Sequence, residues 1–126
     1  MSIRILLTFN AIFALLVSLV LIISPATLAG FFDVEATGVV LQLIQLFGAA
    51  SVGYGLSSWL MRSSGPSEAR TAYLNGGGGG YIVVSVVSAY TVINSLGSPI
   101  TWAVIAGIFL LGVLFLNFGL RGPGVD

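Results

Sequence analysis

Charged residues in this chain occur only outside its long apolar stretches, and this placement constrains the fold more than any other feature. Four stretches, near residues 5–23, 39–61, 76–96 and 99–119, contain no Asp, Glu, Lys or Arg. A run of about 20 apolar residues is long enough to cross a bilayer as a helix. Lipid admits only helices or closed barrels, because it cannot hydrogen-bond to exposed backbone groups. No segment shows the alternation of a barrel strand, so we predict an all-α membrane protein with four transmembrane helices.

Composition agrees with a single membrane domain. The 126 residues are 57% hydrophobic and 6% charged, whereas a typical soluble domain is about 25% charged. Four spans of about 20 residues would use most of the chain, so we expect one transmembrane domain over residues 1–126. The net charge is zero, which leaves no basic surface for nucleic acid.

The arginines fall on one set of span ends, and this placement predicts an orientation. They lie before the first stretch, between the second and third, and after the fourth: Arg4, Arg62, Arg70 and Arg121. The other connections carry only acids (Asp33 and Glu35) or no charge. Because cytoplasmic loops are enriched in Lys and Arg, we predict a four-helix bundle with both termini in the cytoplasm.

A run of five glycines opens the third stretch. Residues 81–96 alone would give about 24 Å of helix, whereas including the run gives about 31 Å, close to the thickness of the hydrocarbon core. We therefore predict that the run is helical and lies within the membrane, in a helix that begins near Pro66. Small residues let helices approach closely, and we expect this run to pack against the small face of the second span. The predicted packing residues are Gly53, Gly55, Gly76, Gly77, Gly78, Gly79 and Gly80.

Six amide side chains are the main polar groups of the spans. Asn10, Asn75 and Asn117 fall toward the predicted cytoplasmic side, whereas Gln42, Gln45 and Asn94 fall toward the outside. We expect each set to form hydrogen bonds between helices, which is the ordinary role of such residues in membranes. The functional alternative is a polar vestibule for a neutral solute or for water.

Several chemistries lack the residues they need. Cys, His and Lys are absent, which removes thiolate, imidazole and Schiff-base chemistry. Ion-coupled transport normally uses an ionisable group inside the membrane, and the spans contain none. We interpret Asp33 and Glu35 as exposed caps of the second helix rather than as a cation site. We therefore expect no catalytic residue, no metal site and no cofactor.

The first 30 residues also fit a second interpretation. Arg4, the apolar stretch that follows it and the sequence Thr27-Leu28-Ala29 before Gly30 resemble a signal peptide with its cleavage site. The apolar stretch of 19 residues exceeds the usual 7–15 of a signal peptide. A membrane helix is therefore the preferred interpretation of this stretch.

Several short motifs follow one another in a recognisable layout: Arg4, the segments 24–32 (SPATLAGFF) and 46–50 (LFGAA), Gly53-x-Gly55 and Trp59-Leu-Met-Arg62. This layout resembles that of small bacterial four-helix membrane proteins of the DoxX-like group and related uncharacterised families. It implies a multi-pass protein of the bacterial cytoplasmic membrane. Proteins of this kind tend to carry a charge near the start of the LFGAA segment, where this chain has Gln45.

These observations together predict a role without catalysis. We expect a small integral membrane protein, either an accessory subunit or a small oligomer, whose partners are lipid and another membrane protein or further copies of itself. The alternative is a channel or facilitator for a small neutral solute or water.

Overall fold

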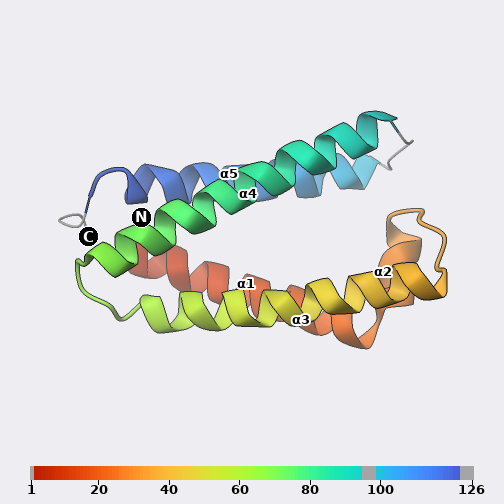
Figure 1. Ribbon diagram of the computed structural model, residues 1–126, viewed down its shortest axis with the longest axis horizontal. Helices are drawn as coiled ribbons and strands as arrows, with labels where there is room; N and C mark the ends of the chain where they lie inside the picture. The colour runs from red at the N-terminus through yellow and green to blue at the C-terminus, as the bar shows by residue number, and fades with distance from the viewer. Residues whose placement is uncertain (1, 95–98, 123–126) are drawn as a thin grey trace. The chain divides into compact units, whose positions relative to one another are not determined.

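The computed structural model describes residues 2–94 and 99–122, which form five α-helices (Figure 1). Four of these helices are long and apolar enough to cross a membrane, as the sequence predicted; the fifth, α2, is short. The helices are α1 (Ile3–Ile23), α2 (Pro25–Phe31), α3 (Gly38–Met61), α4 (Glu68–Asn94) and α5 (Pro99–Gly119).

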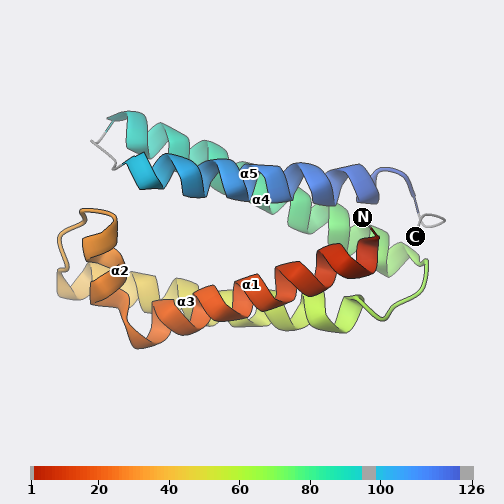
Figure 2. The ribbon, with the colours of Figure 1, turned by 180° about the vertical axis from the view of Figure 1, so that it is seen from behind.

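The chain divides into two compact units, Met1–Ser63 and Ser64–Asp126. In the first unit α1 and α3 pack against each other as an antiparallel hairpin, and α2 contacts both of them at the end where α1 stops and α3 starts (Figures 1 and 2). In the second unit α4 and α5 form another antiparallel hairpin. The sequence also predicts a tight turn from Asn94 to Pro99, with Ser98 as the N-cap of the helix that follows, but residues 95–98 lie outside the described residues.

Helix α1 ends where the sequence predicted, but the chain then forms α2, which the sequence analysis did not anticipate. Pro25 is the first residue of α2, a position that suits proline because its N–H would have no helical partner there. Asp33 follows the helix with a φ of 56°. The N–H of Asp33 bonds to the Gly30 carbonyl at 3.2 Å, and that of Val34 bonds to the Ala29 carbonyl at 2.9 Å. This pair of bonds is a Schellman motif, in which Asp is one of the few residues that tolerate the left-handed conformation.

The N-terminus of α3 is capped by Thr37. Its Oγ1 accepts a hydrogen bond from the backbone N–H of Val40 at 3.4 Å. The prediction that Asp33 and Glu35 cap this helix is therefore wrong, because no acidic residue lies in its first turn. Thr37 takes the role because it directly precedes the first helical residue and its hydroxyl can reach back to an unpaired N–H.

Helix α4 runs without interruption through the glycine run, and this confirms that the run is helical. The helix begins at Glu68, slightly later than expected, and Ser67 accepts a hydrogen bond from the Arg70 N–H at 3.2 Å. Its 27 residues correspond to about 40 Å, more than the roughly 30 Å of a hydrocarbon core. The helix can therefore cross a membrane with its first turns outside the hydrocarbon.

Candidate functional site

A close helix contact of the second unit lies between Gly78 of α4 and Gly112 of α5. A Cβ atom added to Gly78 would be 2.8 Å from Leu116 Cγ, 2.9 Å from Leu116 N and 3.0 Å from the Gly112 carbonyl oxygen. One added to Gly112 would be 2.9 Å from Ile82 Cδ1 and 3.1 Å from the Gly78 carbonyl oxygen. The two backbones touch here, because neither residue carries a side chain to separate them.

Three other glycines of the run do not share this contact, because a Cβ added to Gly76, Gly79 or Gly80 would have no neighbour within 4 Å. Gly77 is half-buried. Adjacent helical residues point about 100° apart around the axis, so a continuous run of five glycines cannot present all its members to one partner. Gly78 is buried and packs closely against α5.

The first unit has a similar contact at Gly48 and Gly55 of α3. A Cβ added to Gly48 would be 2.7 Å from Leu21 Cβ and 3.2 Å from the Ser18 carbonyl oxygen. One added to Gly55 would be 2.9 Å from Leu15 Cγ. The sequence predicted close packing at Gly55 but not at Gly48, although a spacing of seven residues places both on one helix face. Gly53, another predicted packing residue, has open space around an added Cβ.

The two hairpins thus share one packing arrangement. The second helix of each carries two glycines seven residues apart, Gly48 and Gly55 in α3 and Gly112 and Gly119 in α5. The first glycine of each pair lies against a backbone carbonyl of the first helix, that of Ser18 or of Gly78 (3.2 and 3.1 Å from the added Cβ). The expected contact between the glycine run and the second span stays a prediction.

A buried hydrogen bond joins the two long helices of the first unit. Asn10 Nδ2 donates to Ser58 Oγ at 2.7 Å, and both residues are 0% exposed. Toward the other end of this hairpin, Gln45 Nε2 donates to the Ile22 carbonyl at 3.1 Å. These two amides therefore connect α1 and α3, whereas Gln42 is exposed.

Among the described residues of the second unit, Asn94 and Asn117 do not join the two helices as the amides of the first unit do. Asn94 Nδ2 donates to the Tyr90 carbonyl of its own helix at 2.7 Å, and Asn117 is exposed. Asn75 lies against Gly119, where an added Cβ would overlap Asn75 Oδ1 and be 2.8 Å from its Cγ. Asn75 Oδ1 is buried and has no hydrogen-bond partner among the described residues. The Asn75 side chain thus packs against Gly119 of α5.

Arginine side chains at the helix ends stack on aromatic rings. The Arg62 guanidinium lies 3.3 Å from the centre of the Trp59 ring, and it also donates to the Trp59 carbonyl. Arg121 lies over Phe118 at 5.7 Å. Arg70 Nη1 donates to the Ser64 carbonyl at 3.0 Å. Cation–π contacts of this kind suit a boundary between apolar and aqueous surroundings, because the ring can remain in the apolar layer while the charge stays hydrated.

Neither a metal site nor a related protein identifies the function. Across residues 2–94 and 99–122, no group of three or more His, Cys, Asp or Glu side chains could hold a metal ion. No protein-family model, curated protein or solved structure matches the chain. The structure defines two helical hairpins, and within each of them the two long helices pack closely. In the first hairpin, amide hydrogen bonds also join the two helices.

Proposed function

We propose that this chain is a non-enzymatic integral membrane protein that acts as an accessory subunit or a small oligomer. In this proposal α1, α3, α4 and α5 cross the bacterial cytoplasmic membrane as one four-helix bundle, with both termini in the cytoplasm. The resemblance in layout to DoxX-like proteins supports this location.

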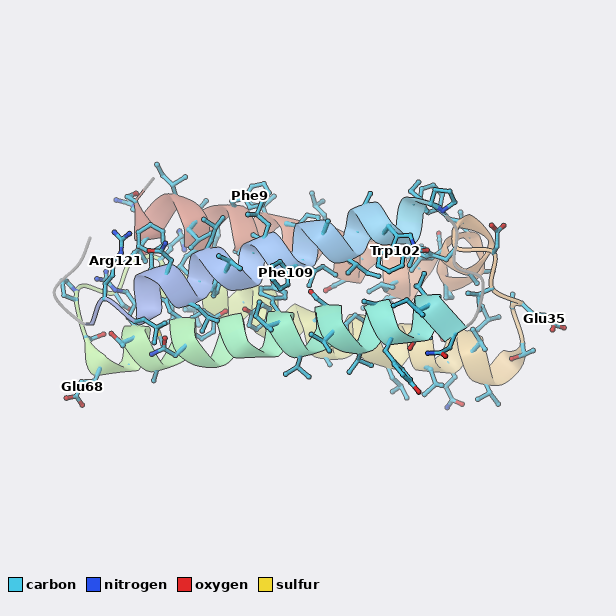
Figure 3. The ribbon with its side chains drawn as sticks, turned by 90° about the horizontal axis from the view of Figure 1, so that it is seen from above. Phe9, Glu35, Glu68, Trp102, Phe109 and Arg121 are labelled. Carbon is cyan, nitrogen blue, oxygen red and sulfur yellow. The ribbon has the colours of Figure 1, made fainter. Side chains whose placement is uncertain are left out.

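The observation that carries the proposal is the apolar surface left uncovered on each hairpin. Leu16 of α1 is 59% exposed, Leu60 of α3 is 71% exposed and Ile93 of α4 is 72% exposed. Water disfavours such surface, whereas lipid or another apolar helix covers it without cost. Charged side chains lie at the hairpin ends, as Glu68 and Arg121 do in the second unit (Figure 3). This distribution matches a bilayer, in which charges remain in the aqueous layers.

The amide contacts support a structural role over solute passage. Asn10 and Gln45 bond to groups within their own hairpin, which uses their hydrogen-bonding capacity to hold α1 against α3. A facilitator would instead present such groups to a solute. A flux assay in proteoliposomes distinguishes the two functions, because an accessory protein should carry neither water nor small neutral solutes. Flux that Gln42→Leu or Gln45→Leu abolishes would replace this proposal with a facilitator.

The orientation is open to a direct test, because the chain contains no cysteine. Single cysteines at the exposed residues Ala36 and Ser63 would report on opposite ends of the first hairpin. In intact cells, a membrane-impermeant maleimide should label Ala36→Cys, but it should label Ser63→Cys only after permeabilisation. The reverse pattern would refute the proposed orientation, and labelling of both in intact cells would refute the membrane crossing between them.

The partner requires a separate experiment. Gentle extraction from native membranes, followed by mass spectrometry and a mass measurement of the complex, should give either a fixed heteromeric stoichiometry or a homo-oligomer. A monomer without partners would contradict both forms of the proposed role.

A further inference from the structure

The short helix α2 occupies a defined level at one end of the first hairpin. Ser24 alone separates it from the end of α1, and α2 contacts both α1 and α3 (Figures 1 and 2). Arg4 and Arg62 lie at the opposite end of the same hairpin, where α1 begins and α3 ends. If α1 and α3 span the bilayer, α2 lies where the hydrocarbon meets the outer headgroups.

Some side chains of α2 and its C-terminal turn are buried against the hairpin, whereas others are exposed to the surroundings. Ala29 is 2% exposed, whereas Phe31 is 56% exposed and Val34 is 46% exposed. Phe31 also packs edge to face with Phe32, with ring centres 5.6 Å apart. The outward side chains of this region are therefore an aromatic ring and an aliphatic group, which suit the boundary between acyl chains and headgroups.

The backbone at both ends of α2 is also suited to surroundings with little water. Pro25 lacks the N–H that would be unpaired at the first helical position. At the other end, the N–H groups of Asp33 and Val34 donate to the carbonyls of Gly30 and Ala29, so these carbonyls of the last turn have partners. Unpaired backbone groups are costly near hydrocarbon, so these ends allow the helix to lie at the membrane surface.

Two carboxylates limit how deeply α2 and the turn after it can enter the membrane. Asp33 and Glu35 are both exposed and alternate with Val34 in sequence, and Figure 3 shows Glu35 extending away from the first hairpin. Charged carboxylates remain in water or among headgroups because burying them in hydrocarbon is costly. With these carboxylates among the headgroups, a helix α2 that lies along the membrane plane lets Phe31 and Val34 reach the upper acyl region.

We propose that α2 and the turn after it form an interfacial anchor, in which Phe31 and Val34 insert into the non-cytoplasmic leaflet at the level of the lipid carbonyls. This inference rests on the proposed function, because it requires α1 and α3 to cross the bilayer. Its partner is the lipid surface itself, and the anchor fixes the tilt and height of the first hairpin.

Depth-resolved fluorescence quenching tests the anchor in the full-length protein. Trp59→Phe and Trp102→Phe remove the native tryptophans, and Phe31→Trp or Val34→Trp then provides a single reporter. Each variant is reconstituted in phosphatidylcholine vesicles that carry bromine at a shallow, middle or deep position of the acyl chain. We expect the strongest quenching of both reporters by shallow bromines, with emission shifted to the blue of that from a Glu35→Trp control.

A reporter in α1 separates failure of the anchor from failure of the membrane proposal. Leu16→Trp lies near the middle of α1 and should be quenched most by deep bromines. If Leu16→Trp behaves in this way but Phe31→Trp and Val34→Trp emit as in water and are not quenched, the anchor is refuted while the span stands. Strongest quenching of the reporters at 31 and 34 by deep bromines would also refute an interfacial position. If no reporter is quenched, the proposed function and the anchor both fail.

Discussion

Replacing Gly78 with alanine tests the packing of α4 against α5 most directly. The added methyl group would lie 2.8 Å from Leu116 Cγ, 2.9 Å from Leu116 N and 3.0 Å from the Gly112 carbonyl oxygen. The last two atoms belong to the α5 backbone, which cannot rotate away as a side chain can. The two helices must therefore separate locally to admit the methyl group.

The size of the effect follows from two opposing terms. Alanine stabilises a helix over glycine by about 0.8–1.0 kcal/mol, whereas overpacking a close contact costs about 1–3 kcal/mol. Gly78→Ala should therefore range from nearly neutral to about 2 kcal/mol destabilising. Gly79→Ala is a matched control, because its Cβ has no neighbour within 4 Å and only the favourable helix term applies. The difference between the two variants isolates the packing cost, about 1–3 kcal/mol.

The assay is equilibrium unfolding of both variants and the unaltered protein in a mild detergent, by heat or by titration with a denaturing detergent. Gly79→Ala should be as stable as the unaltered protein or more stable, and Gly78→Ala should be less stable than Gly79→Ala by about 1–3 kcal/mol. Equal stability of the two variants would refute the close contact between Gly78 and α5. Measuring both in the same detergent removes differences in micelle environment.

Three further experiments test the remaining contacts by the same unfolding measurements. Asn10→Ala and Ser58→Ala should each destabilise the protein, with a double-mutant coupling of about 0.6 kcal/mol, the average for such bonds in membranes; strictly additive losses would argue against a direct bond. Gly119→Ala should destabilise because its methyl group overlaps the Asn75 carbonyl oxygen, and adding Asn75→Ala should recover part of that loss; without recovery, the clash lies elsewhere. Gln45→Leu should cost less than Asn10→Ala because Gln45 is exposed and Asn10 is fully buried; a larger loss would contradict this order.

The sequence alone determined the helical class of the chain and the approximate extent of its long helices. Charge-free apolar stretches of span length favour helices because only paired backbone groups are stable in lipid. The same length argument predicted that residues 76–80 are helical despite the low helix propensity of glycine, and α4 confirms it. Proline was harder to interpret, because it both stops a preceding helix and suits the first position of a new one. Pro25 does both, so the sequence predicted the end of α1 but not α2.

Which small residues touch a neighbouring helix could not be read from the sequence and depends on the tertiary packing. Composition makes the glycines of the run equivalent, but the rotation of α4 about its axis places Gly78 against α5, while an added Cβ on Gly79 would have no neighbour within 4 Å. The rotation of α3 likewise places Gly55 against α1 and leaves Gly53, two residues earlier, at an open position. The packing of α1 against α3 also brings Asn10 to Ser58, 48 residues later in the sequence. Such contacts depend on which helix is the neighbour and how it is rotated, and a periodic apolar sequence is compatible with several choices of both.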